Sequence, residues 1–276
     1  MSRAKESIDI TREFFDDIDY TKITWLGGAG FLINTLGTII LIDPVLMTQP
    51  DQDLISETGL KLYAKYPILA NQIPRVDYVL YTHPDNDHLG AITAKELARL
   101  NPKFIGPLSV FKQLTVIGVN PRSIDTCRSG DKIQIQDILL EVTPSDHPWQ
   151  LMNPSLYGKP FRKDDCCGFI LTTKDARCFF PGDTRLMEEH LEIKDIDLLA
   201  LDVSTDLYHL GKDGATVLAN TLSEALLIPI HYGTYDAPDI IAHMGNPDEM
   251  MKRIVNHEKR AKIVAPGEIL TLKGKN

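Results

Sequence analysis

The chain has 276 residues, and 43% of them are hydrophobic, which is enough apolar surface for one large core. We therefore predict a single α/β domain over residues 1–276. The formal net charge is −9 and the basic residues are dispersed, which argues against nucleic acid as a partner. No apolar run approaches the ~18 residues of a membrane span, and no leader-like apolar segment is evident. We expect a cytoplasmic protein with no membrane partner, which could form a homo-oligomer.

The first half of the chain consists of predicted strands separated by short helices. A flexible Gly27-Gly28-Ala29-Gly30 segment between two apolar runs predicts a hairpin. Thr93 followed by Glu96 is typical of a capping box that opens a helix. The predicted strands are 22–26, 31–34, 38–42, 78–81 and 103–106, and the predicted helices are 54–66, 93–100 and 108–117.

The second half has the same character without a sequence repeat. Asp213 predicts the cap of a helix that runs to Ala225, and Asn246-Pro247 predicts a helix with proline at its first position. The predicted strands are 132–136, 138–143, 167–173, 176–180, 197–201, 226–230 and 268–272. Two runs of strands, each followed by helices, predict two sheets packed together with helices outside. The four cysteines show no paired framework and are predicted to be reduced core residues (Cys127, Cys166, Cys167, Cys178).

The most informative stretch is the block His83-Pro84-Asp85-Asn86-Asp87-His88, which follows the apolar run 78–81. Four potential metal ligands within six residues indicate a site, because a packed core has no use for so many desolvated polar groups. Imidazole and carboxylate together suit a hard-to-borderline divalent cation.

Other acidic and histidine residues also follow apolar runs: Asp43, Asp146-His147, Asp183 and His231. Strand ends converge on one edge of a sheet, where sites are usually built. One such residue alone is most often an ordinary turn residue, but several of them together with the 83–88 block predict a shared site.

In this order, these residues resemble the metallo-β-lactamase superfamily of metal-dependent hydrolases. The matching elements are Asp43, the 83–88 block, His147, Gly182-Asp183-Thr184, and His231 within Ile230-His231-Tyr232-Gly233. The resemblance implies an αββα four-layer sandwich of two mixed sheets with a dinuclear site at one edge. Within the superfamily, residues 82–90 and 104–107 look most like the L-ascorbate-6-phosphate lactonase branch.

The resemblance also implies a ligand set. One metal would be held by His83, Asp85 and His147, a second by Asp87, His88 and His231, and Asp183 would bridge them. Asp85 departs from the family pattern, which commonly has histidine there, and a carboxylate favours Mn or Fe relative to Zn. We therefore expect two divalent ions, Zn or Mn, with Fe as a further option. From the sequence alone, Asp146 remains an alternative to His147.

Two cations that share a bridging water would lower its pKa, and the resulting hydroxide would attack a carbonyl or phosphorus. Asp87 could then accept or shuttle a proton, and Asp43 could orient a ligand imidazole or be a plain turn residue. Substrate-facing candidates are Trp149, Arg185, His209 and Tyr232, of which Arg185 would bind an anionic group or form a surface salt bridge. Three further histidines, at 190, 243 and 257, are predicted to face solvent.

The resulting hypothesis is a dinuclear hydrolase acting on a small, anionic ester or lactone. A phosphodiesterase or RNA-end nuclease is a second reading, which the acidic balance disfavours. A di-iron redox protein is a third, which Asp85 allows. A non-catalytic metal-binding fold is a fourth, and it would predict the loss of a ligand, whereas all seven are present in the sequence.

Overall fold

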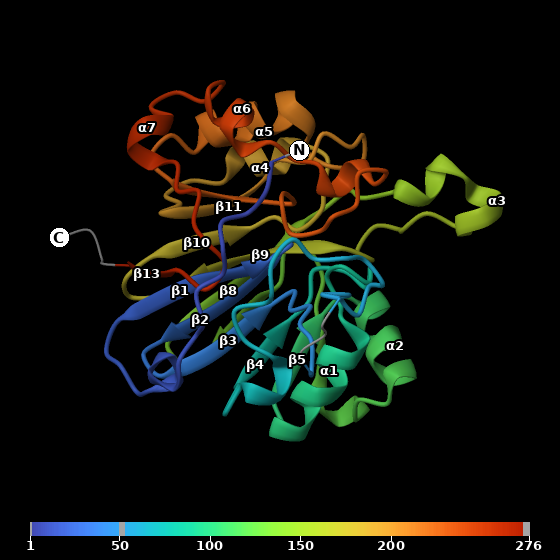
Figure 1. The fold of residues 1–276 in the computed structure, drawn as a ribbon, viewed down its shortest axis with the longest axis vertical. Helices are drawn as coiled ribbons and strands as arrows, with labels where there is room; N and C mark the ends of the chain where they lie inside the picture. Colours follow the sequence, from blue (N-terminus) through green and yellow to red (C-terminus); the bar gives the residue numbers. More distant parts are fainter. Residues whose placement is uncertain (1, 50–52, 273–276) are drawn as a thin grey trace.

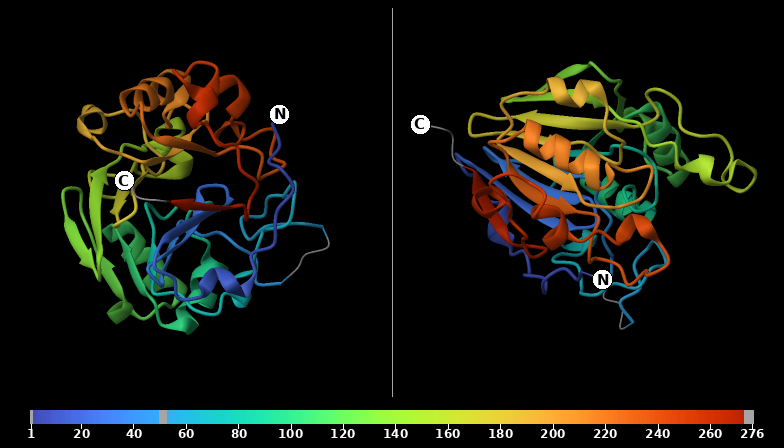
Figure 2. Two further views of the ribbon diagram at one scale, coloured as in Figure 1. Left: turned by 90° about the vertical axis from the view of Figure 1, so that its left-hand side faces the viewer. Right: turned by 90° about the horizontal axis from the view of Figure 1, so that it is seen from above.

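The structure, a computed structural model, describes residues 2–49 and 53–272. Within these residues two β-sheets pack face to face, and helices cover both outer faces (Figure 1, Figure 2). Each sheet contains both parallel and antiparallel pairs. The predicted αββα sandwich of two mixed sheets is therefore confirmed.

The first sheet has the strand order β13-β1-β2-β3-β4-β5-β6. Its strands are β1 (Thr21–Gly27), β2 (Gly30–Thr35), β3 (Thr38–Ile42), β4 (Tyr78–Leu80), β5 (Lys103–Gly106), β6 (Ile124–Thr126) and β13 (Ile269–Leu272). The pairs from β13 to β3 are antiparallel, and those from β3 to β6 are parallel. The sequence did not predict β6, which has only three residues.

The second sheet has the order β12-β11-β10-β9-β8-β7. Its strands are β7 (Lys132–Ile135), β8 (Ile138–Pro144), β9 (Cys167–Thr172), β10 (Arg177–Phe180), β11 (Leu198–Asp202) and β12 (Leu226–Ile230). The pairs β10–β11 and β11–β12 are parallel, and the pairs from β7 to β10 are antiparallel. The predicted strands of this half therefore fall within a residue or two of the observed ones.

Helices cover the outer faces of the sheets. The α-helices of the described residues are α1 (Ala91–Leu97), α2 (Leu108–Ile117), α3 (Pro154–Tyr157), α4 (Glu188–Glu192), α5 (Gly211–Thr221), α6 (Pro247–Met251) and α7 (His257–Arg260). Helices α1 and α2 lie against the first sheet, whereas α4 to α7 lie on the side of the second (Figure 1). The short α3 is part of an arm that projects from the body of the molecule.

Strand β3 shows why the sequence of a central strand is apolar throughout. Ile40 and Ile42 belong to the core between the two sheets, while Ile39 and Leu41 belong to the core beneath α1 and α2. Because both faces of the strand are covered, alternation of apolar and polar residues disappears. All four cysteines are buried and free, which confirms that prediction.

The predicted helix at 54–66 is wrong. Gly59 adopts a left-handed conformation with φ +81°, and the Gly59 amide donates to the Ser56 carbonyl in a tight turn. Residue Ile55 then pairs with Lys61, and Leu62 bridges to Tyr235. The segment is a folded loop because a glycine turn reverses the chain where the helix would have continued.

Two predicted helix starts are also wrong. Helix α1 begins after Gly90, so Thr93 lies inside it, and the Thr93 hydroxyl donates to the Leu46 carbonyl at 2.6 Å instead of capping. Helix α5 begins at Gly211 and ends at Thr221, which places Asp213 in its first turn. Helix α6 does begin as predicted, because the Asn246 side chain accepts from the Glu249 amide and Pro247 follows it. No helix of the described residues is long and apolar enough to cross a membrane.

Candidate metal centre

The candidate site lies where several strands end at one edge of the sandwich. Most of its side chains come from residues that end a strand or lie within three positions after its end: Asp43 after β3, His83 after β4, His147 after β8, Asp183 after β10, Asp202 at the end of β11 and His231 after β12. All six are buried. These strands run in the same direction within their sheets and end at one edge of the sandwich, which agrees with the prediction made from the ends of the apolar runs.

The carboxylate of Asp183 is the centre of the cluster, and imidazole Nε2 atoms surround it on two sides. On the Oδ1 side lie His231 at 2.8 Å and His88 at 3.0 Å; on the Oδ2 side lie His209 at 3.5 Å, His147 at 3.7 Å and His83 at 4.0 Å. One carboxylate thus faces two separate groups of nitrogen atoms.

Two further carboxylates accompany these groups. The Oδ2 atom of Asp85 lies 3.4 Å from His83 Nε2 and 3.5 Å from His147 Nε2. Asp87 offers an oxygen that, together with ligand atoms of His88, Asp183 and His231, falls within 4.8 Å of the others. All seven residues that the resemblance named are therefore brought together.

The inward-facing atoms of the cluster are buried without hydrogen-bond partners. They include Nε2 of His83, His88 and His231, and Oδ1 of Asp183, whose close approach lacks hydrogen-bond geometry. Buried polar atoms without partners are costly unless a ligand satisfies them. Converging imidazole nitrogen atoms beside a carboxylate are the donors that divalent transition metals prefer, so the residues present fit a metal centre.

The outer nitrogen of each of three imidazoles is held by an acceptor. His88 Nδ1 lies 2.8 Å from Asp43 Oδ2, and His209 Nδ1 lies 2.6 Å from Asp202 Oδ2. His147 Nδ1 donates to the Tyr208 carbonyl at 2.8 Å. These contacts place the proton on Nδ1 and leave Nε2 facing Asp183, which is how metal-binding histidines are usually oriented.

Asp43 is itself fixed by Thr82. The Thr82 amide donates to Asp43 Oδ1 at 2.8 Å, and its hydroxyl donates to Asp43 Oδ2 at 2.6 Å. Asp43 therefore does more than end a strand, since it links β3, Thr82 and the His88 ring.

The electrostatics of the cluster favour a positive charge beside Asp183. Burial alone would raise the pKa of Asp183, but the imidazoles of His231 and His88 outweigh it and hold the pKa well below its ordinary value. Burial would likewise lower the pKa of His209, but Asp183 and Asp202 raise it to about 10. A carboxylate that stays ionised among buried imidazoles suits a divalent cation.

The structure separates His147 from its neighbour Asp146. His147 turns towards Asp183, whereas Asp146 Oδ2 accepts from Arg185 Nε at 2.8 Å and also from its Nη2. This pair keeps Asp146 out of the cluster. It also makes Arg185 a salt-bridge partner at the surface, its plainer predicted role.

The predictions for one tyrosine and two histidines are wrong: Tyr232 was expected to face substrate, and His190 and His243 were expected to face solvent. Tyr232 is buried and stacks on Trp25, with ring centroids 5.2 Å apart, so it packs in the core and does not face substrate. His190 is fully buried, and its Nε2 donates to the Pro144 carbonyl at 2.9 Å. His243 is buried beside the cluster, with Nε2 3.8 Å from Asp87 Oδ2. The helix-like surroundings of the two histidines in the sequence did not reveal that they are buried.

The pairing of Asp202 with His209 was not predicted. Asp202 ends the apolar run of β11, which is the same signal that identified Asp43 and Asp183. Applied to every strand, the signal would have found it.

A cavity of about 690 Å³ opens on the cluster. Its walls include Asp85, Asp87, His147, Asp183 and His209, together with side chains from the 149–157 arm and from residues 239–243. The volume is within the usual range of small-molecule sites. The metal centre therefore forms the polar floor of a pocket.

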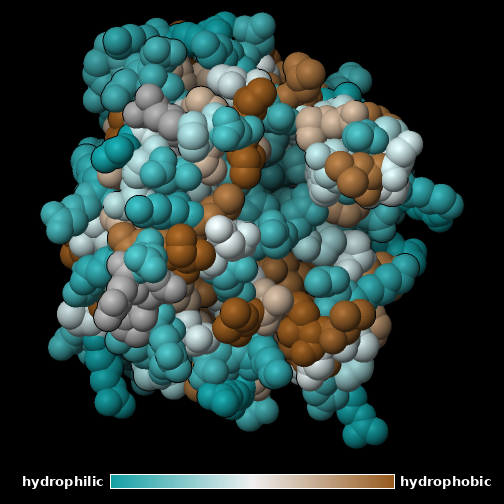
Figure 3. Space-filling view, turned by 45° about the vertical axis from the view of Figure 1, so that its right-hand side comes forward, coloured by the Kyte–Doolittle hydropathy of each residue, from teal (hydrophilic) through white to brown (hydrophobic). Residues whose placement is uncertain are grey.

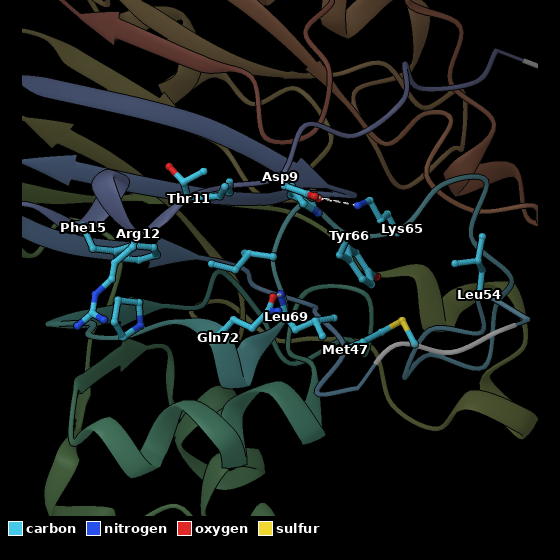
Figure 4. Close-up of a pocket in the computed structure, with 14 residues that line it drawn as sticks. Asp9, Thr11, Arg12, Phe15, Met47, Leu54, Lys65, Tyr66, Leu69 and Gln72 are labelled. Carbon is cyan, nitrogen blue, oxygen red and sulfur yellow. Dashed lines mark hydrogen bonds and ion pairs between the residues drawn. The ribbon is translucent and has the colours of Figure 1, made fainter.

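A second cavity, of about 560 Å³, lies between the N-terminal segment and residues 65–74 (Figure 4). Asp9 and Lys65 line this cavity and form an ion pair, and Tyr66 lines it as well. The Tyr66 hydroxyl is 3.4 Å from that of Tyr235. No group of potential metal ligands among the described residues falls in this cavity.

Known proteins are similar to this chain in sequence or in fold. Residues 38–232 match the model of the beta-lactamase superfamily domain. A UPF0173 metal-dependent hydrolase from Methanoculleus marisnigri is 27% identical over 254 residues, which cover 90% of this chain and 95% of that protein. An N-acyl-phosphatidylethanolamine-hydrolyzing phospholipase D 1 from Caenorhabditis elegans is 25% identical over 254 residues, covering 82% and 68%. The crystal structure of an isothiocyanate hydrolase from Delia radicum gut bacteria has a TM-score of 0.69 at 17% identity, covering 92% and 100%.

A two-sheet sandwich with a His and Asp cluster at one edge defines the class of the metallo-β-lactamase fold. The matched span contains every strand-end residue of the cluster from Asp43 to His231. The chain belongs to the metallo-β-lactamase superfamily of metal-dependent hydrolases. The likeness to L-ascorbate-6-phosphate lactonases stays a prediction.

Proposed function

We propose that this protein hydrolyses a small ester or lactone with two divalent cations, Zn or Mn, with Fe as a further option. The observation that carries the proposal is the position of Asp183 between two groups of imidazoles whose Nε2 atoms face its two oxygens. A shared carboxylate of this kind suits a pair of cations.

In this proposal the cluster divides between the two oxygens of Asp183. His83, Asp85 and His147 would hold one cation, and Asp87, His88 and His231 would hold the other. When bound, such cations lower the pKa of water and polarise the oxygen on which negative charge develops. His209 lies close enough to Asp183 to steady its Oδ2 atom.

Other groups of the protein would orient the imidazoles and transfer the proton. Asp43, Asp202 and the Tyr208 carbonyl keep three imidazoles in one orientation. Asp87 lines the pocket, and in this proposal it would accept a proton and return it to the leaving group. Burial lowers the pKa of neighbouring His243 to about 4, so this ring stays neutral beside Asp87 at neutral pH.

The test combines metal analysis with a substrate panel. The protein is depleted with a chelator, reloaded with Zn, Mn or Fe(II) under air-free conditions, and its bound metal is counted by mass spectrometry. Lactones, carboxylic esters, thioesters and phosphodiesters are then assayed with each form. Two ions per chain and hydrolysis of an ester or lactone are expected; one ion or none, or no hydrolysis by any form, would contradict the proposal.

A phosphodiesterase is the second candidate, and the name of the Caenorhabditis elegans relative favours it. The same panel separates the two, because a phosphodiesterase would act on the phosphodiesters in preference to the esters. A di-iron redox protein, which Asp85 allows, would instead retain iron on air-free purification and show no hydrolysis.

A further inference from the structure

The walls of the pocket above the metal centre are largely apolar. Six large hydrophobic side chains line it: Leu60, Trp149, Met152, Tyr157, Ile240 and Ile241. Several of them are exposed although large, including Met152 at 57% and Ile241 at 53%. Figure 3 shows apolar side chains on the projecting arm and across the hollow beside it. Exposed apolar surface around a cavity indicates contact with an apolar part of a ligand.

The arm contributes an aromatic pair to this wall. The rings of Trp149 and Tyr157 meet edge to face, with centroids 4.9 Å apart. Trp149 Nε1 is buried and has no hydrogen-bond partner. An indole N–H can only donate, so a hydrogen-bond acceptor on the ligand, such as a carbonyl or ether oxygen, would satisfy it.

The charged residues of the pocket outside the cluster are acidic. Asp206 and Asp239 line it, and no Lys or Arg does so among residues 2–49 and 53–272. Neither carboxylate forms an ion pair with a described Lys or Arg. Asp206 Oδ1 accepts from the Tyr208 amide at 2.8 Å, which fixes it beside the cavity.

The residue expected to bind an anion does not reach this space. Arg185 is engaged by Asp146 and is absent from the pocket wall. An anionic group beside Asp206 and Asp239 would therefore meet two carboxylates that form no ion pair with a described Lys or Arg, whereas the positively charged His209 belongs to the cluster on the pocket floor. Like charges in such a position disfavour binding and select against the wrong ligand.

Building on the proposed hydrolase function, we infer that the pocket selects esters or lactones that carry an apolar arm with a neutral or positively charged end, and rejects those with an anionic end. The apolar arm packs against Trp149 and Tyr157. Asp206 and Asp239 set the charge preference.

The test uses one series of acyl compounds that differ only at the far end of the acyl chain, which is methyl, trimethylammonium or sulfonate. Each is made as a nitrophenyl ester for kinetics and as a non-hydrolysed amide for binding by calorimetry. The methyl and trimethylammonium esters are expected to exceed the sulfonate in kcat/KM by roughly tenfold, and the amides to follow the same order in Kd. Equal or tighter binding of the sulfonate amide would overturn the inference.

The variant Asp206→Asn/Asp239→Asn tests the assigned residues. Asparagine retains the Oδ1 acceptor for the Tyr208 amide, so the loop keeps its hydrogen bond. The roughly tenfold discrimination against the sulfonate should shrink towards unity. The control is Asp19→Asn/Asp137→Asn, which removes the same charge from exposed positions outside the pocket and should keep the discrimination.

Identical discrimination in the two double variants would overturn the role of Asp206 and Asp239. Failure of every ester to react, with the amide order intact, would overturn the hydrolase proposal while supporting the charge preference. The two proposals therefore fail through different measurements.

Discussion

Asp183 is the residue on which the proposed chemistry most depends, because its two oxygens face both groups of imidazoles. Its carboxylate remains ionised although it is buried, since the neighbouring rings hold the pKa down. A neutral amide of the same shape would lack the charge that two cations share.

We expect Asp183→Asn to remove bound metal and activity together. The loss of affinity should exceed the ~10–100-fold that follows when only a residue orienting a ligand is removed. Metal content by mass spectrometry and the ester assay check this. Asp146→Asn, a neighbouring acid outside the cluster, should retain both, and full metal and activity in Asp183→Asn would contradict the dinuclear assignment.

Asp85 is the irregular member of the 83–88 block, and it lies within 3.5 Å of two imidazoles. We expect Asp85→His to keep the fold and to shift metal preference towards Zn, because nitrogen replaces a hard oxygen donor. Competitive loading with Zn and Mn measures the change. An unaltered metal profile would show that Asp85 is not a ligand.

At the scale of elements, the folded loop that replaces the predicted helix at 54–66 supports α1. The Glu57 carboxylate accepts from the Ile92 amide at 2.7 Å and from the Thr93 amide at 3.3 Å. The cap of this helix thus comes from 36 residues away in the chain. Local pattern could not reveal it, because the capping group and the helix meet only in the folded molecule.

We expect Glu57→Ala to lower the free energy of unfolding by about 1–2 kcal/mol, the usual effect of losing a helix cap. Urea denaturation followed by circular dichroism measures the effect. The control Glu96→Ala removes a carboxylate that pairs with exposed Arg99, and should cost about 0.5 kcal/mol or less. Equal effects in the two variants would count against the capping role.

At the scale of the whole molecule, stability should depend on pH through His190, which joins α4 to the end of β8. Burial lowers the pKa of His190, and its neutral ring donates to the Pro144 carbonyl. The unfolded chain takes up a proton near the ordinary pKa of about 6.5. The stability from this residue is therefore complete above that pH and is lost as the pH falls through it towards the folded-state pKa.

We expect the free energy of unfolding to fall less between pH 7.5 and pH 5.5 in His190→Gln than in the natural protein. Glutamine can still donate to Pro144 but cannot titrate. Because the two proteins share every other histidine, the difference between their pH-dependent changes in unfolding free energy reports on His190 alone. Urea unfolding at the two pH values gives the measurement, and parallel declines would contradict the prediction.

The whole-molecule arrangement was largely predictable because it depends on repeated local signals. Apolar runs that end in Asp or His identified strands and site residues at once, as Asp43, Asp183 and His231 show. Turns at glycine and contacts made by loops were harder to predict from the sequence. Tyr232 and His243 were misplaced because their burial depends on segments that are distant in sequence.

The sequence by itself determined the layered class of the fold and the superfamily, and it named the residues of the cluster except for the choice between Asp146 and His147, since each follows from residue type and order along the chain. Orientation and charge pairing depend on which loops meet in space, and spacing along a chain does not record that.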